Sequence, residues 1–180
     1  MVTSRRGCLV VSWHRRRSRI WGHRVHKENE ASVARLSVVV IDDSPTILGL
    51  FELVIMPPDD GVFDLVATIA NATESLAACD KHKPDVVILD YEMPGVDGLT
   101  LIGQIRERHP DTVVFLMSGH DDSFGILHKE AVVRGATEFV PKPSVDDNPQ
   151  FVRHLILNYL ERANKLPERF RPKSGALEST

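Results

Sequence analysis

The hydrophobic positions of this chain fall into short runs with two different spacings. Residues 36–41 form a nearly continuous apolar run, and residues 85–90 and 112–117 repeat it. Runs of this length and composition are typical of strands that are buried on both faces of a parallel sheet. Between such runs apolar residues recur every three or four positions, as they do in residues 47–54, and this spacing predicts amphipathic helices.

The whole pattern predicts five strands that alternate with five helices. The predicted strands cover residues 36–41, 62–69, 85–90, 112–117 and 137–140. The predicted helices cover residues 45–56, 73–81, a segment marked by Leu99, Ile102 and Ile105, 122–134 and 151–160, and residues 93–98 are expected to form a loop. Regular alternation of this kind implies right-handed crossovers and an α/β fold with a doubly wound parallel sheet.

Composition sets the limits of this domain. The chain has 180 residues, of which 42% are hydrophobic and 26% charged, which suits one domain with tails. We expect the domain at residues 35–163 and a polar tail or linker remnant at 164–180. There is no apolar run of about 18 residues, so no membrane span is expected. Two separated cysteines, Cys8 and Cys79, match no disulfide framework or metal spacing, which favours a cytoplasmic location.

Charge divides the chain unevenly. Residues 1–27 hold eight Arg or Lys residues and no acid, so the remainder carries 14 basic and 25 acidic side chains, a net charge of −11. An acidic body argues against nucleic-acid binding and suits a divalent cation. We interpret residues 1–34 as a basic, disordered tail or a start codon assigned too far upstream. A transit peptide or a nucleic-acid-binding arm is the alternative for this stretch.

Polar residues follow four of the predicted strands at their carboxyl ends. They are Asp42 and Asp43 after the first strand, Asp90 after the third, Ser118 after the fourth and Lys142 after the fifth. In doubly wound sheets ligands bind beyond these strand ends. Three converging carboxylates repel one another unless a cation relieves them, and hard oxygen ligands in an open site favour Mg²⁺. A carboxylate nucleophile, a lysine and a hydroxyl donor are what phosphoryl transfer to Asp90 would require.

Four sequence runs together resemble the receiver domains of bacterial response regulators, closest to those of chemotaxis methylesterase-type regulators. The runs are Val40-Ile41-Asp42-Asp43-Ser44, Leu89-Asp90-Tyr91-Glu92-Met93-Pro94-Gly95-Val96-Asp97-Gly98, Met117-Ser118-Gly119 and Phe139-Val140-Pro141-Lys142-Pro143-Ser144. The resemblance covers residues 36–162. It implies a flavodoxin-like fold with five parallel strands in the order 2-1-3-4-5.

The resemblance also implies a role for each residue. Asp90 would be the phosphoacceptor, and Mg²⁺ would be held by Asp42, Asp43, Asp90 and the backbone carbonyl of Glu92. Ser118 and Lys142 would bind the phosphoryl group, and Ser118 and Phe139 would act as switch residues. The implied partners are a histidine kinase or phosphotransfer protein and a downstream protein target. A homodimer through the face of the fourth helix, fifth strand and last helix is left open.

Several alternatives to this interpretation remain. Residues 164–180 contain no recognisable DNA-binding or methylesterase domain, so we expect a phosphoacceptor signalling domain rather than an enzyme, acting through a partner. The chain would otherwise be the regulatory half of a chemotaxis methylesterase, or a binding module independent of phosphorylation. A haloacid-dehalogenase-type phosphatase would need a second acid two residues after its nucleophile, and Ser44 stands at that position relative to Asp42.

Overall fold

The computed structural model describes residues 35–55, 61–119, 125–144 and 146–167. The strands are β1 Leu36–Ile41, β2 Phe63–Ile69, β3 Val86–Asp90, β4 Glu92–Met93, β5 Val96–Asp97, β6 Val113–Ser118 and β7 Glu138–Pro141. The helices are α1 Pro45–Ile55, α2 Ala72–His82, α3 Gly98–Arg108, α4 Ile126–Arg134 and α5 Pro149–Arg162. The expected alternation of strands and helices is confirmed. The expected basic tail at 1–34 lies outside the described residues.

Five strands form one parallel sheet in the order β2-β1-β3-β6-β7. In chain order these are strands 2-1-3-4-5, so the predicted doubly wound topology is confirmed. β1 and β3 lie inside the sheet, and every residue of β3 is buried. This burial is why these segments appear in the sequence as continuous apolar runs rather than alternating ones.

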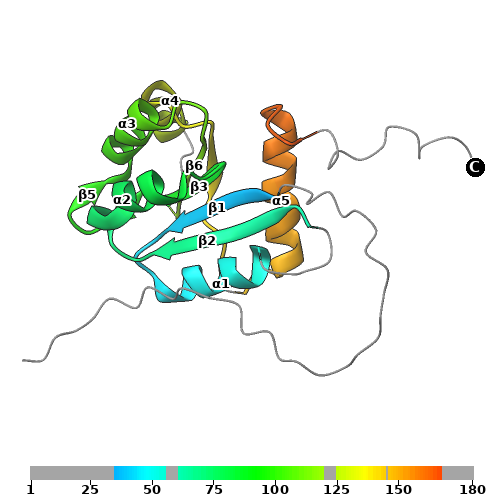
Figure 1. The fold of residues 1–180 in the computed structure, drawn as a ribbon. Helices are drawn as coiled ribbons and strands as arrows, with labels where there is room; N and C mark the ends of the chain where they lie inside the picture. Colours follow the sequence, from blue (N-terminus) through cyan, green and yellow to red (C-terminus); the bar gives the residue numbers. More distant parts are fainter. Residues whose placement is uncertain (1–34, 56–60, 120–124, 145, 168–180) are drawn as a thin grey trace, which may run out of the picture. The chain divides into compact units, whose positions relative to one another are not determined.

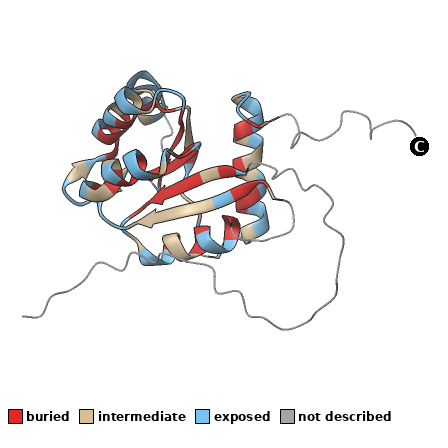
Figure 2. Cartoon of the chain, in the orientation of Figure 1, coloured by how far each residue is buried: buried red, intermediate tan, exposed pale blue. Residues whose placement is uncertain are grey.

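The helices cover both faces of the sheet (Figure 1). Alternate residues of each strand point to opposite faces, and this divides the core into two clusters. Val38, Val40 and Ile88 belong to the cluster under α1 and α5, whereas Val39, Ile41 and Leu89 belong to the cluster under α2, α3 and α4. Buried residues therefore follow the strands and the inner helix faces, while the outer helix faces are exposed (Figure 2).

Helix starts follow the capping residues in the sequence. Asn71 accepts a hydrogen bond from Thr73 N at 3.0 Å before α2, and Asn148 accepts one from Gln150 N at 2.9 Å before α5. The predicted start of α1 at Ser44-Pro45 is confirmed, and Ser44 Oγ lies 3.5 Å from Ile47 N. Such caps satisfy backbone N–H groups that have no partner inside the helix.

Three segments differ from the sequence-based expectation. The loop expected at 93–98 contains a short antiparallel pair, β4 with β5, because Gly95 with φ of 88° allows a tight reversal. α4 begins at Ile126 within the described residues, whereas a start at residue 122 was expected, and residues 120–124 are not described. Packing also continues past residue 163, since Leu166 is buried and its N–H donates to Leu160 O.

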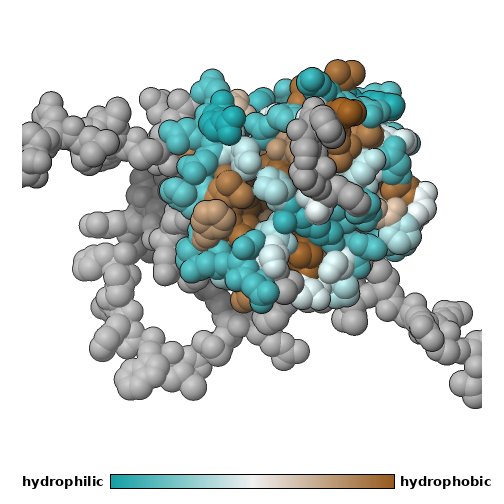
Figure 3. All heavy atoms as spheres, turned by 180° about the vertical axis from the view of Figure 1, so that it is seen from behind, coloured by the Kyte–Doolittle hydropathy of each residue, from teal (hydrophilic) through white to brown (hydrophobic). Residues whose placement is uncertain are grey.

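The surface carries apolar side chains in separate places. Seen from behind, apolar atoms form several patches among hydrophilic ones (Figure 3). The large hydrophobic residues exposed among the described residues include Ile126 and Val133 on α4, Leu53 on α1 and Phe151 on α5. None of the described helices is both long and apolar enough to cross a membrane.

Candidate functional site

The polar residues predicted from strand ends lie at one edge of the sheet. Asp42 and Asp43 follow β1, Asp90 is the last residue of β3, and Ser118 is the last residue of β6. Lys142 follows β7 directly. Because these four strands are neighbours and parallel, their carboxyl ends open onto the same edge.

The three carboxylates converge on a small space. One oxygen from each of Asp42, Asp43 and Asp90 lies within 4.8 Å of the other two. Asp42 is 0% exposed and Asp90 is 1% exposed, whereas Asp43 is open to solvent. Charges held this close and this deep need compensation, because burial weakens screening by water.

Lys142 supplies part of that compensation. Its Nζ lies 2.8 Å from Asp90 Oδ2 and 2.9 Å from Asp42 Oδ2. Burial disfavours the ammonium, but the hydrogen bonds and charges of Asp90 and Asp42 outweigh this effect and raise the pKa of Lys142. The backbone of Lys142 is fixed as well, since its N–H donates to Ser118 O at 2.8 Å.

Asp42 has one oxygen that the protein satisfies incompletely. Oδ1 accepts a hydrogen bond from Ser44 N at 2.9 Å. Oδ2 is fully buried and meets the Lys142 ammonium as an ion pair, with no hydrogen bond of good geometry from the described residues. Burial is the main cause that raises the pKa of Asp42, and Lys142 and the Ser44 N–H act against it.

This donor set fits a hard divalent cation. Three carboxylates and one ammonium leave a formal charge of about −2 in the pocket when all are ionised. Asp42 Oδ2 lacks a full partner, and Asp43 opens the pocket to the water that Mg²⁺ usually retains. The three carboxylates can therefore bind a cation, and the cation together with the Lys142 ammonium can offset the charge of an anionic substrate.

The remaining predicted residues lie on β6, β4 and β7. Ser118 is buried on β6, one residue beyond Met117, the partner of Asp90 in the sheet register. Glu92 is exposed and begins β4, two residues after Asp90. Phe139 is half-buried on β7, and its ring stacks on His128 of α4 rather than lying in the pocket.

One residue that sequence reasoning did not assign to the site supports the Asp90 strand end. A Cβ placed on Gly98 would lie 2.9 Å from Asp90 O and 2.9 Å from Tyr91 Cα, so the first turn of α3 packs directly on this backbone. Gly98 N also donates to Tyr91 O at 3.3 Å. The Asp97-Gly98 pair indicated only a turn in the sequence. The close approach depends on the fold.

Comparison with known proteins gives a consistent result. Residues 38–155 match the family described as response regulator receiver domain. The chain is 35% identical over 126 residues to the DNA-binding transcriptional regulator NtrC of Salmonella typhimurium, covering 69% of this chain and 26% of that protein. It is also 35% identical over 134 residues to a protein-glutamate methylesterase/protein-glutamine glutaminase of Shewanella sp., covering 71% of this chain and 36% of that protein.

Solved structures show the same fold. The response regulator domain of Thermotoga maritima CheB has a TM-score of 0.60 and 25% identity, and the match covers 77% of this chain and 100% of that one. The receiver domain of NarL from Mycobacterium tuberculosis has a TM-score of 0.58 and 28% identity, covering 71% and 97%. The chain thus spans about a quarter to two fifths of its curated relatives but nearly all of these isolated domains.

Proposed function

The chain belongs to the response regulator receiver domain family of two-component signalling, and on this premise we propose that Asp90 accepts a phosphoryl group in a Mg²⁺-dependent reaction. The observation that carries the proposal is the convergence of Asp42, Asp43 and Asp90 within 4.8 Å, with Lys142 bonded to Asp90 at 2.8 Å. The donor would be a histidine kinase or a phosphotransfer protein.

The reaction requires little covalent chemistry from the protein. A carboxylate oxygen of Asp90 forms a bond to phosphorus while the bond from phosphorus to the donor breaks, and the donor keeps that electron pair. Bound Mg²⁺, held by Asp42, Asp43, Asp90 and the backbone carbonyl of Glu92, would neutralise charge on the phosphoryl oxygens. Lys142 holds Asp90 Oδ2 and orients the carboxylate for attack.

Phosphorylation would then change the partners of Lys142 and Ser118. The acyl phosphate no longer carries the Asp90 carboxylate charge, so the ammonium that pairs with Asp90 Oδ2 would pair with phosphoryl oxygens. The Ser118 hydroxyl would donate to the same group, and Phe139 would turn inward. Contacts present in one state and absent in the other shift the population between the two.

The output would act through the surface of α4, β7 and α5. Ile126 is 67% exposed and Val133 is 84% exposed on α4, which suits contact with a downstream protein or a second copy of this chain. We propose that the chain signals through this contact, with no activity beyond self-catalysed phosphotransfer and dephosphorylation. A cytoplasmic location is part of the proposal, because the sequence spacing of Cys8 and Cys79 matches no disulfide framework.

A second candidate function concerns the larger protein. Because the similarity to the methylesterase of Shewanella sp. covers 36% of that protein, this chain would also suit the regulatory part of such an enzyme. Phosphorylation of Asp90 would then control an attached esterase domain instead of a separate partner. A binding module that ignores phosphorylation is disfavoured, since it would not need Lys142 held against two buried carboxylates.

The test is phosphorylation by acetyl phosphate. With Mg²⁺ we expect the intact mass to rise by one phosphoryl group, and we expect no rise with excess chelator or in Asp90→Asn. Asp111→Asn is the matched control, because Asp111 is an exposed aspartate in the turn between α3 and β6. Labelling that persists in Asp90→Asn would contradict the assignment.

A further inference from the structure

His128 of α4 contacts two consecutive residues of β7. Its imidazole stacks on the ring of Phe139, with centroids 5.9 Å apart and planes inclined by 20°. Its Nε2 also lies 3.3 Å from Glu138 Oε1. The same Glu138 oxygen accepts a hydrogen bond from Phe139 N at 3.4 Å. One side chain therefore holds both the ring of Phe139 and the carboxylate beside it.

This contact lies on a helix that buries few of its residues fully. Ala131 is the one residue of this nine-residue helix that is buried among those described. Its amino end starts at Gly125, in the left-handed region with φ of 62° and without a side-chain cap. Its carboxyl end is fastened by Arg106, whose Nη2 and Nε donate to Gly135 O at 2.7 and 3.1 Å. His128 thus adds to Leu127, which packs on the core, a contact between the amino-terminal half of α4 and β7.

We propose that His128 is a positioning residue that restrains Phe139 in the unphosphorylated state. This inference rests on the proposed function, in which Phe139 turns inward when Asp90 is phosphorylated. The stack is present in this structure, which holds no phosphoryl group, and an inward turn would take the Phe139 ring away from the imidazole and break it. A contact made in one state only sets the equilibrium between the two.

The stack on Phe139 and the contact with Glu138 make separable contributions. An aromatic pair of this kind should shift the equilibrium between the two arrangements of Phe139 by roughly 2- to 10-fold. The pair with Glu138 adds less, because His128 is 48% exposed and exposed ion pairs are weak. His128→Phe keeps a ring against Phe139 and removes the nitrogen that faces Glu138. His128→Ala removes both contacts, and Glu138→Gln removes the charge alone.

The experiment measures the apparent affinity for beryllofluoride, a phosphoryl mimic, in Mg²⁺. The full chain is titrated while amide NMR signals near Asp90 and Phe139 are followed. We expect His128→Ala to bind roughly 2- to 10-fold more tightly than the unaltered chain, and His128→Phe and Glu138→Gln to stay within about twofold of it. Lys129→Ala is the control, since Lys129 is the exposed next residue of α4 and should leave the affinity unchanged.

The variants test the His128 restraint and the phosphoacceptor assignment separately. If His128→Ala binds no more tightly than the unaltered chain while Asp90→Asn abolishes binding, the restraint is wrong and the phosphoacceptor assignment stands. If Asp90→Asn binds beryllofluoride as well as the unaltered chain does, the proposed function itself is wrong. Thermal unfolding of each variant is recorded, and if His128→Ala is unstable, His128→Leu, which also removes the ring, is titrated in its place and should tighten binding in the same way. Equal tightening in His128→Phe and His128→Ala would contradict the role of the stack.

Discussion

Two neighbouring helices on one face of the sheet, α3 and α4, are built very differently. α3 has eleven residues and buries five of them, Gly98, Leu99, Leu101, Ile102 and Ile105. α4 has nine residues and buries Ala131 alone among those described. The two helices contact the same sheet, so the difference arises from their sequences. α3 therefore packs on this face through many buried side chains, and α4 packs on it through few.

The ends of the two helices differ in the same way. Asp97 caps α3 by accepting from Leu99 N at 3.0 Å, and Gly98 packs on the backbone of Asp90. α4 begins at Gly125 without a side-chain cap. A helix with few buried contacts and an uncapped end can change position at low cost. The strand end at Asp90 therefore has closely packed support from α3, whereas α4 beside it has little.

Truncating one buried and one exposed residue should give the largest contrast. Ile105 of α3 is 0% exposed, so Ile105→Ala should lower the free energy of unfolding by about 2–5 kcal/mol. Val133 of α4 is 84% exposed, and Val133→Ala should change it by less than about 0.5 kcal/mol. Urea unfolding of both variants checks this. Similar losses would mean that α4 is held as firmly as α3.

Two glycines of α3 offer a smaller and more local test. Gly98→Ala forces a methyl against the backbone of Asp90 and Tyr91, and should cost about 1–3 kcal/mol and slow phosphorylation by acetyl phosphate. Gly103 lies inside the same helix with no atom within 4 Å of a built Cβ. Gly103→Ala should therefore stabilise the domain by about 0.5–1 kcal/mol. The comparison fails if Gly98→Ala is as stable as the unaltered chain and is phosphorylated at the same rate.

The sequence predicted the buried strands and their ends better than the sparsely packed α4. Buried strands such as residues 85–90 appear as uninterrupted apolar runs, and Asp42, Asp43, Asp90 and Ser118 stand at or just after the ends of such strands, so topology alone places these four residues at one edge. In the structure, Lys142 forms ion pairs with both Asp42 and Asp90, so these three strand ends do meet. Hydrophobic periodicity and strand order were sufficient to predict which residues share this edge, because the packing of the core determines both.

Contacts between distant segments could not be predicted in this way. The approach of Gly98 to Asp90 depends on how α3 leaves β5, and the stack of His128 on Phe139 depends on where α4 lies. The short β4–β5 pair was expected to be a loop, because two-residue strands leave no periodicity to detect. The apolar pattern of α4 is weak because few of its side chains are buried, and a weak pattern does not define where the helix begins.

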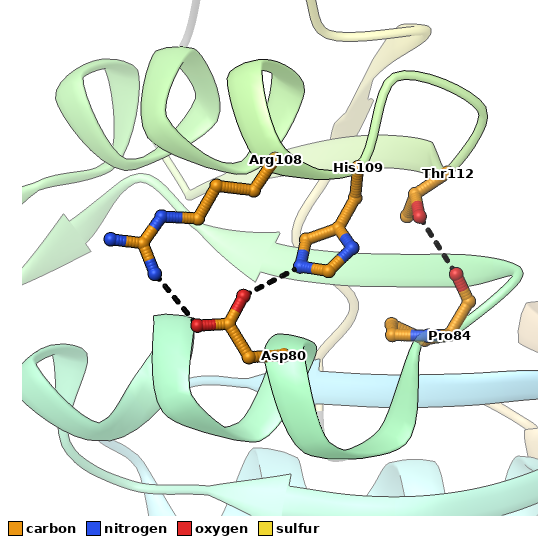
Figure 4. A network of polar contacts seen from close by, with 5 residues as sticks. All are labelled: Asp80, Pro84, Arg108, His109 and Thr112. Carbon is orange, nitrogen blue, oxygen red and sulfur yellow. Dashed lines mark hydrogen bonds and ion pairs between the residues drawn. The ribbon is translucent and has the colours of Figure 1, made fainter.

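The free energy of unfolding should depend on pH through the polar contacts of Asp80, where the end of α3 meets α2. Arg108 Nη1 donates to Asp80 Oδ2 at 2.6 Å, and His109 Nε2 lies 3.0 Å from Asp80 Oδ1 (Figure 4). Nearby, the Thr112 hydroxyl donates a hydrogen bond to Pro84 O. The hydrogen bond with His109, followed by the charge of Arg108, lowers the pKa of Asp80.

A carboxyl whose pKa is lower in the folded chain stabilises the fold above its unfolded pKa of about 3.9, and this stabilisation is lost as the pH falls through the folded value. Asp80→Asn removes the titrating group, so the stability advantage of the unaltered chain over this variant should be present at pH 6 and shrink below pH 4. Urea unfolding midpoints of both chains across this range measure it. Glu107→Gln, at an exposed carboxylate of α3, should show no such convergence. An advantage that stays constant down to pH 2.5 would mean that Asp80 contributes through packing alone, and that the α2–α3 fastening is not electrostatic.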